Sequence, residues 1–514
     1  MDTIATKIDN DNTTTTTTNN NNNTTAANIA YICPIAAVKA SQAALDTTGG
    51  KIVLFASHYS TIGYGTTKNK ESVAAYSTSN EFFLYGNIDS QQHLRKANNT
   101  DSNTYKDFTL LGQALVSSQT CLHIIVNSPS PSSSSSSSSS MYIDIPYYSY
   151  LTDICGGKLH MMEGTMTDDD NSIRLSATVN DIISTMRGSD AIIKLRTSIG
   201  VTIDDVITKG HLRTEGHEVA FAGIDNSMTL CYNLKNDTVL KDEDRVDFQL
   251  AILYTSLDMQ RIVRVHNISY MSSSNSTIIF KHTDLDAVMT ALTKQAVKRM
   301  LTAPSDEKKG GRPFLTDSLI DILYKYRIKC SPTSSRGQLI LPESLKVLPL
   351  YVLGLLKHPA FLENQPITNK NSRPDDVIST LLVRGHERAY QLSLLRTSSI
   401  ITTINTVHPQ LYNLTNINDD DNIAPNGIIN INTSLSQQLP PTIPLSSEMF
   451  ESDSLYLLAD GISLFIYIGR NVSQNILTSW FDIGSNAYGR PSSLAINTRY
   501  HHHHHYYYYY YYYY

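Results

Sequence analysis

Short apolar runs alternate with polar stretches of helical length across residues 51–163. Ile52 to Phe55 and Leu122 to Val126 are apolar runs of strand length, and Tyr105 to Val116 is a polar stretch long enough for a helix. Strands that alternate with helical patterns are typical of βαβ units. The pattern therefore predicts an α/β layer built on a parallel sheet.

The block at residues 164–275 has the character of strands. Phe248 to Thr255 and Gln260 to Ile268 flank a short turn, which predicts an antiparallel hairpin. Because side chains alternate along a strand, Val263 and Val265 share one face. We expect that face to be dry and the other, with Arg264 and His266, to be polar, as in a β-sandwich.

Apolar residues recur at helical spacing between residues 283 and 412. One such face consists of Leu285, Met289, Leu292, Ala296 and Met300. Pro349 lies inside a later apolar run, where it should kink or interrupt the helix. Four leucines around that run are expected in the core of a helical domain: Leu345, Leu348, Leu353 and Leu356.

Two further apolar strands are predicted near the carboxyl end. They span Leu455 to Leu458 and Leu464 to Ile468, and Asp460 with Gly461 forms the turn between them. A helix beginning near Ser473 would complete a small α/β unit.

Low-complexity tracts interrupt these blocks. They cannot bury enough apolar surface to offset the entropy of ordering, so we expect them to be disordered. The tracts are Thr13 to Thr18, Asn19 to Asn23, Ser132 to Ser140, Asn416 to Asn432, His501 to His505 and Tyr506 to Tyr514. For the His run, repeat expansion or translation of non-coding sequence is a better interpretation than metal binding.

Composition narrows the functional classes. The 514 residues suffice for about two to four domains, and the net charge of −6 argues against a general nucleic-acid binder. The five cysteines form no C-x-x-C pair, which argues against a zinc ribbon and favours a reducing compartment. No signal peptide is visible, and the most apolar stretch is too short to span a membrane. The chain therefore reads as cytosolic.

Motifs for catalysis are absent from the sequence. There is no P-loop, no H-E-x-x-H and no G-x-S-x-G, so no catalytic residue and no metal ligand is assigned. The acidic runs at residues 168–170 and 419–421 are better interpreted as solvated loops than as metal sites.

Five blocks resemble one family, the COPII inner-coat cargo adaptors of the Sec-twenty-four type within the Sec-twenty-three/Sec-twenty-four family. The longest is GQLILPESLKVLPLYVLGLLKHPAF, from Gly337 to Phe361. The others, in family order, are GGKIVLFASHYSTIGYG at Gly49 to Gly65, FQLAILYTSLDMQRIVRVHNIS at Phe248 to Ser269, ERAYQLSLLRT with HPQLY between Glu387 and Tyr412, and LYLLADGISLFIYIGRNVS at Leu455 to Ser473.

The resemblance implies a multidomain α and β fold. Its expected parts are a disordered segment at 1–27, a partial trunk of the von Willebrand A type at 28–163 with a poly-Ser insertion at 132–140, a β-sandwich at 164–282, an all-helical domain at 283–414, a linker at 415–440, a partial gelsolin-like module at 441–490 and a His/Tyr tail at 491–514. The match is incomplete at both ends, and the zinc that the family implies has no ligands here, so no cofactor is expected.

The resemblance also implies a function. Such an adaptor would pair with the GTPase-activating sister subunit, respond to a membrane-bound small GTPase, and collect the tails of cargo and SNARE proteins. It would work on the cytosolic face of the endoplasmic reticulum and on COPII vesicles, during export to the Golgi.

One basic pair is the candidate cargo site. In Ala191 to Arg196, interpreted as a strand, Lys194 and Arg196 point to the same face, about 7 Å apart. In the resembled family the matching strand carries a basic pair that helps bind acidic export signals. The alternative is an ordinary solvated strand face. Arg261 and Arg264 are interpreted as sandwich surface and are not assigned to cargo.

Two other functions remain open. The chain could be the GTPase-activating sister subunit, for which Arg388 and Arg396 are the available finger arginines, although their surroundings resemble the adaptor. It could also be a gelsolin-type protein that binds actin or calcium, an interpretation that rests on the carboxyl-terminal block alone.

Overall fold

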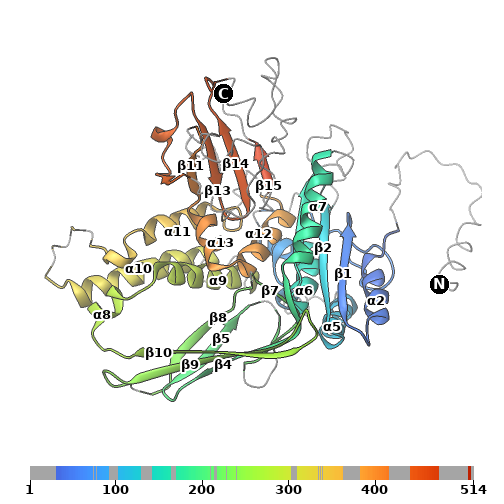
Figure 1. Ribbon diagram of the computed structural model, residues 1–514, viewed down its shortest axis with the longest axis horizontal. Helices are drawn as coiled ribbons and strands as arrows, with labels where there is room; N and C mark the ends of the chain where they lie inside the picture. The colour runs from blue at the N-terminus through green and yellow to red at the C-terminus, as the bar shows by residue number, and fades with distance from the viewer. Residues whose placement is uncertain are drawn as a thin grey trace, which may run out of the picture.

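The architecture is known from a computed structural model, drawn in Figure 1. It describes residues 31–91, 102–128, 142–163, 169–302, 310–362, 383–415, 440–473 and 507–510, with short gaps at 73–74, 77, 209, 213–216, 227, 239, 334, 336 and 339. Four regions follow one another along the chain: a parallel-sheet layer, a β-sandwich, a helical bundle and a carboxyl-terminal sheet.

The parallel-sheet layer has three strands in the order β1 (Gly50–Ala56), β2 (Thr120–Ser128) and β3 (Leu159–Glu163), and all pair in parallel. The central strand β2 is buried because both faces are covered. Helices surround the sheet: α2 (Pro34–Ala44), η2 (Ser79–Glu81), α3 (Phe82–Tyr85), α5 (Ser102–Ser117), α6 (Ile145–Cys155) and α7 (Asp169–Ser184). The predicted α/β layer is confirmed.

Helix α7 differs from the sequence prediction, which placed residues 164–184 in the sandwich. Leu175, Val179 and Ile182 recur at helical spacing and pack against Ile125 and Met162 of the parallel sheet. This segment therefore forms a helix that covers the sheet, and the sandwich begins only at the following strand.

The sandwich consists of a five-stranded sheet in the order β10-β9-β4-β7-β6 and a two-stranded sheet of β5 and β8. Its strands are β4 (Met186–Thr197), β5 (Val201–Ile207), β6 (His211–Leu212), β7 (Val219–Asp225), β8 (Cys231–Asn236), β9 (Arg245–Ser256) and β10 (Arg261–Met271). Strands β9 and β10 pair antiparallel over their full length, which confirms the predicted hairpin. Figure 1 shows them extending below the helices.

The prediction that Val263 and Val265 form a dry face of β10 is wrong. Val263 and Val265 are 61% and 49% exposed. The register of the hairpin explains this, because the buried Tyr254 of β9 lies opposite Ile262. Ile262 therefore packs against the core, and the two valines lie on the opposite, outward face of this edge strand.

The helical bundle contains α8 (Ser276–Lys281), α9 (Leu285–Thr302), α10 (Gly311–Cys330), η3 (Glu343–Leu345), α11 (Leu348–Lys357), α12 (Gly385–Thr397) and α13 (Ile400–Val407). The predicted face of α9 is confirmed. Met289, Leu292 and Ala296 are buried, and Leu285 and Met300 pack against them.

One of the four leucines expected in the core is outside it. Leu345 and Leu348 are buried and Leu356 packs against the core, but Leu353 is 50% exposed. Pro349 lies in the first turn of α11, where proline is tolerated, so it does not interrupt the helix as expected, and the helical periodicity starts at Leu348. Val352 and Leu355 are then the positions that turn inward.

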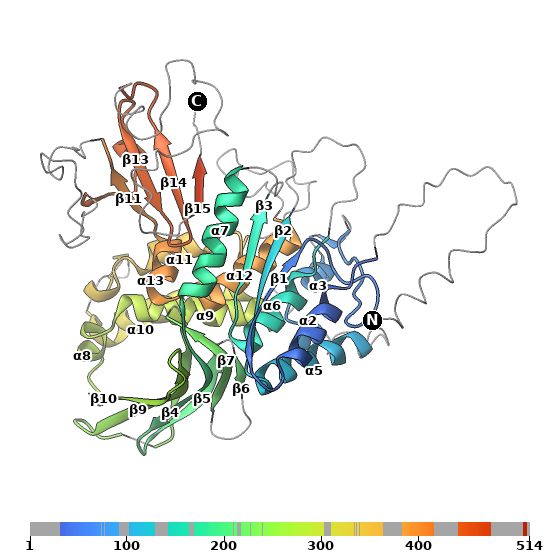
Figure 2. The same cartoon turned by 45° about the vertical axis from the view of Figure 1, so that its right-hand side comes forward.

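The parallel-sheet layer and the helical bundle share one core. A single cluster joins Leu122 of β2 and Tyr148 of α6 to Met289 of α9, Leu355 of α11 and Leu392 of α12. Figure 2 shows α12 beside α6, where the two regions meet.

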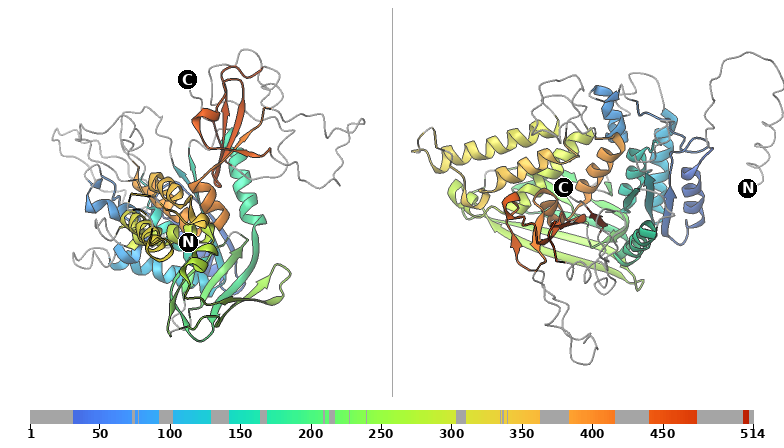
Figure 3. Two further views of the ribbon diagram at one scale, coloured as in Figure 1. Left: turned by 90° about the vertical axis from the view of Figure 1, so that its left-hand side faces the viewer. Right: turned by 90° about the horizontal axis from the view of Figure 1, so that it is seen from above.

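The carboxyl-terminal sheet has the order β12-β11-β13-β14-β15. Its elements are β11 (Gln410–Asn413), β12 (Thr442–Ile443), η6 (Ser447–Met449), β13 (Leu455–Ala459), β14 (Ser463–Ile468) and β15 (Tyr507–Tyr510), and Figure 3 shows the sheet from two further sides. The two predicted strands and their turn are confirmed, with Gly461 at φ +84°.

Two assignments at this end differ from the sequence predictions. Residues 410–413, expected in the helical domain, form a strand that pairs with β13. Residues 507–510 of the tail pair with β14 rather than being disordered. The helix expected near Ser473 and the poly-Ser tract lie outside the described residues. None of the described helices is both long and apolar enough to cross a bilayer.

Candidate functional site

Strand β4 carries the two cations that the sequence singles out. Ala191 and Ile193 are 1% and 5% exposed and point into the sandwich core. Because side chains alternate, Lys194 and Arg196 point to the opposite face. The structure thus brings the predicted pair together on the outer face of the five-stranded sheet.

Arg196 is exposed and is held by a chain of neutral amides. Its Nη1 donates a hydrogen bond of 2.9 Å to Oε1 of Gln249 on β9. The Nε2 of Gln249 in turn donates to Oδ1 of Asn267 on β10, at 3.1 Å. These contacts follow the cross-strand register and orient the guanidinium without neutralising it.

Lys194 lies in a different electrostatic setting. Its Nζ is 2.8 Å from Oε1 of Glu218, which precedes β7. The two side chains are 33% and 26% exposed, so water screens the ion pair only in part. The two cations of the candidate site are therefore not equivalent.

Apolar side chains share the outer face with the basic pair. The register of β4, β9 and β10 places them in two cross-strand rows: Ile192, Leu253 and Val263 in one, and Ala251 and Val265 beside Lys194 in the next. An extended ligand on this face would meet both charge and apolar surface.

The other arginines of the hairpin are used within the sandwich. Arg261 pairs with Asp190 at 2.7 Å and donates to the hydroxyl of Thr255. Arg264 lies over the ring of Tyr254, 5.9 Å from its centroid. Both contacts fit the predicted role of these arginines as sandwich surface.

Arg388, one of the two arginines weighed as a catalytic finger, is buried. Its side chain is 5% exposed and pairs with Glu81 at 3.1 Å. Its Nη2 donates to the carbonyl of Leu362, and its guanidinium lies 5.3 Å from the ring centroid of Tyr85. A side chain held in this way cannot reach into a neighbouring protein.

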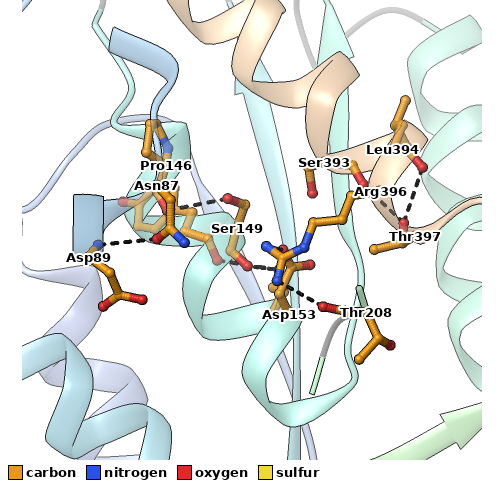
Figure 4. Close-up of polar contacts among 12 residues, drawn as sticks. Asn87, Asp89, Pro146, Ser149, Asp153, Thr208, Ser393, Leu394, Arg396 and Thr397 are labelled. Atoms are coloured by element: carbon orange, nitrogen blue, oxygen red, sulfur yellow. Dashed lines mark hydrogen bonds and ion pairs between the residues drawn. The ribbon is translucent and has the colours of Figure 1, made fainter. Parts of the chain in front are cut away.

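Arg396, the second of these arginines, joins three regions (Figure 4). From the end of α12 it reaches Asp153 of α6 at 3.1 Å and donates to the carbonyl of Thr208, just after β5, at 3.0 Å. Buried Lys294 of α9 fixes the same helix end by donating to the carbonyls of residues 395, 396 and 398. The arrangement is that of a structural joint.

A small pocket lies beside this joint. Its volume is about 110 Å³, and its lining includes Asn87, Lys298 and Leu301. Pockets for drug-sized ligands usually measure about 300–1,000 Å³, so this one is too small for such a ligand.

A second ionic joint connects the parallel-sheet layer to the start of α12. Glu71 accepts two hydrogen bonds from Arg384, at 3.1 and 2.8 Å, and one from the hydroxyl of Tyr76. Burial raises the pKa of Tyr76 to about 12. Burial also lowers the pKa of His386 to about 4, and nearby Arg384 acts in the same direction.

Metal binding finds no support among the described residues. They contain no cluster of three or more His, Cys, Asp or Glu side chains placed to hold an ion. The His run at 501–505 lies outside the described part of the chain.

Sequence reasoning missed Glu218 and Gln249, which contact the basic pair. The hairpin gives a local signal only for the position of Gln249 opposite Asn267, because its contact with Arg196 depends on the pairing of β4 with β9, 53 residues away in sequence. Glu218 gives no such signal, because it lies 24 residues from Lys194 and meets it only through the pairing of β4 with β7.

Comparison with known families matches three parts of the chain. Residues 188–273 match the Sec23/Sec24 beta-sandwich domain, 284–404 match the Sec23/Sec24 helical domain, and 436–479 match the gelsolin repeat. The first match contains the basic pair, and the second contains Arg388 and Arg396.

Curated relatives include protein transport protein Sec24C of Homo sapiens, 27% identical over 67% of this chain and 28% of the relative. Protein transport protein SEC24 B of Arabidopsis thaliana is 26% identical over 88% of this chain and 36% of the relative. The chain thus spans about a third of the length of these relatives.

The fold is also similar to a solved structure. The crystal structure of the human COPII-coat protein Sec24c aligns with a TM-score of 0.69 and 23% identity, over 88% of this chain and 52% of that chain. The sandwich, the helical bundle and the gelsolin-like sheet occur together in the order that the family matches require. The chain therefore contains a beta-sandwich and a helical region that match the Sec23/Sec24 domain families, and the relatives named above are proteins of the Sec24 type.

Proposed function

We propose that the chain acts as a non-enzymatic cargo adaptor of the COPII coat and binds acidic export signals on the outer face of β4, β9 and β10. The observation that carries the proposal is Arg196, an exposed guanidinium oriented by Gln249. Arginine binds carboxylates through charge-assisted, often bidentate hydrogen bonds, and Lys194 lies two residues away on the same face.

The proposal extends to partners and location by family analogy. The chain would pair with the GTPase-activating sister subunit and be recruited by a membrane-bound small GTPase. It would then lie on the cytosolic face of the endoplasmic reticulum and collect the tails of cargo and SNARE proteins for transport to the Golgi.

The direct test is titration of a labelled acidic peptide against the parent protein and its variants. A charge-assisted hydrogen bond contributes about 1.5–3 kcal/mol, so Arg196→Ala should weaken binding about ten-fold or more. Arg196→Glu should weaken it further, because repulsion adds to the lost bond. Lys194→Arg should bind at least as well as the parent, and added salt should weaken binding throughout.

The matched control is Lys325→Glu, the same reversal of charge on the exposed surface of α10. This variant should bind the peptide like the parent. If folded Arg196→Glu also binds like the parent, the basic pair is an ordinary solvated face and the assignment is wrong.

A second experiment addresses the sister-subunit alternative. Arg388 and Arg396 are each paired with a carboxylate inside the protein, so neither is expected to act as a catalytic finger. The purified chain should neither hydrolyse GTP nor accelerate hydrolysis by the coat GTPase. Acceleration that is lost in Arg396→Ala would favour the sister subunit instead.

A further inference from the structure

Glu218 forms an ion pair with Lys194, one of the two cations that an acidic ligand would need. Its carboxylate lies 2.8 Å from Nζ of Lys194, and both side chains are about two-thirds or more buried. Arg196, in contrast, contacts only the neutral Gln249 among the described residues. One half of the basic pair is therefore open to a ligand, and the other half is already neutralised.

We propose that Glu218 is a built-in competitor that sets the affinity and selectivity of this face for acidic peptides. The inference rests on the proposed function and deepens it. A ligand carboxylate can bind Arg196 directly, but it reaches Lys194 only by displacing Glu218. Binding of a second carboxylate is thus weakened by the free energy of an existing ion pair.

The spacing of the two cations means that Glu218 should affect peptides with two acidic side chains more than peptides with one. Lys194 and Arg196 are two residues apart on a strand, so their side chains are about 7 Å apart. An extended peptide presents its side chains at positions i and i+2 with similar spacing. A peptide with two acids at that spacing must compete with Glu218, whereas a peptide with one acid can bind through Arg196 alone.

The decisive variant is Glu218→Gln, which keeps the size of the side chain and removes its charge. Partly exposed ion pairs contribute at most about 1 kcal/mol, so the affinity of this variant for a diacidic peptide should rise about two- to five-fold. Affinity for the peptide with one acid replaced by its amide should change less than about two-fold. The double variant Lys194→Gln/Glu218→Gln should lose the gain.

The matched control is Asp190→Asn. Asp190 forms another carboxylate–cation pair of the same sheet, with Arg261 at 2.7 Å and comparable exposure. The variant Asp190→Asn removes the same charge at the far end of the face. It therefore reports how the loss of one negative charge on this sheet changes peptide affinity in general. Asn also tolerates the positive φ of 47° at this position.

The measurement is fluorescence anisotropy with the two labelled peptides, on proteins checked for equal melting temperature. A gain for Glu218→Gln that exceeds the gain for Asp190→Asn, and that is largest for the diacidic peptide, supports the competitor. Binding by Glu218→Gln when the parent does not bind would support it too.

Two outcomes overturn the inference while leaving the proposed function intact. In both, the parent binds and Arg196→Glu weakens binding. In the first, Glu218→Gln equals Asp190→Asn. In the second, Glu218→Gln binds more weakly than the parent, which would mean that Glu218 positions Lys194 instead of competing for it. If neither the parent nor Glu218→Gln binds any peptide, the proposed function fails and the inference fails with it.

Discussion

Two leucines on α11 allow a controlled test of the helical bundle. Leu355 is fully buried and Leu353 is 50% exposed, although the two are only two residues apart on one helix. The variants Leu355→Ala and Leu353→Ala have identical composition and place the same substitution in the same helix. Any difference in stability between them therefore reports burial alone.

The expected difference follows from packing. Truncating a buried leucine to alanine costs about 2–5 kcal/mol, because apolar burial is lost and a cavity remains. Leu355 lies in the core shared by the parallel-sheet layer and the helical bundle, so the upper part of this range applies. An exposed substitution usually changes stability by less than about 0.5 kcal/mol, and alanine is a slightly better helix former than leucine.

The assay is thermal melting followed by circular dichroism, with chemical denaturation as the second measurement. One kcal/mol shifts the melting temperature of a domain of this size by about 2–4 °C, so Leu355→Ala should melt roughly 7–20 °C below the parent. Leu353→Ala should melt within about 2 °C of it. Equal losses in the two variants, or a larger loss at Leu353, would refute the described orientation of α11.

Three further predictions concern the stability of contacts made by the helical bundle. Arg388→Ala removes the cation that pairs with the buried carboxylate of Glu81 and should cost about 3–5 kcal/mol in a urea titration. In Gly354→Ala, the new Cβ would lie 2.5 Å from the carbonyl oxygen of Val407, so α11 and α13 must separate and the melting temperature should fall, at a cost of about 1–3 kcal/mol. Because burial lowers the pKa of His386 to about 4, the unfolded state binds more protons between about pH 4 and 6.5, and stability falls as the pH decreases through that range. The free energy of unfolding, measured at pH 7 and pH 5, should decrease by about 2 kcal/mol less in His386→Leu than in the parent. The same decrease in both proteins would contradict the lowered pKa of His386.

Local patterns in the sequence predict much of this fold. Continuous apolar runs mark β1 and β2, and helical spacing marks the buried face of α9 from Met289 to Ala296. The hairpin of β9 and β10 follows from two runs and a short turn. These elements are predictable because their signal lies within a few neighbouring residues.

Orientation is harder to predict, because it depends on partners distant in sequence. The valines of β10 are apolar and so suggest a buried face. They are exposed because the buried Tyr254 of the neighbouring strand lies opposite Ile262, which places Ile262 on the core side and the valines on the other side. Leu353 falls outside the core because α11 begins at Leu348 and turns Leu348, Val352 and Leu355 inward. For the candidate site, the shared face of Lys194 and Arg196 is predictable from alternation, whereas Glu218 is brought in by tertiary pairing alone.

The joint at Arg396 has a consequence for how the protein is made. Asp153 and Arg396 are 243 residues apart in the chain, and the core around them is one cluster. A ribosome adds about 5–20 residues per second, so α6 emerges roughly 10–50 s before α12 is synthesised. During that interval the apolar surface that the parallel-sheet layer shares with the helical bundle lacks its natural cover, until the last helices dock.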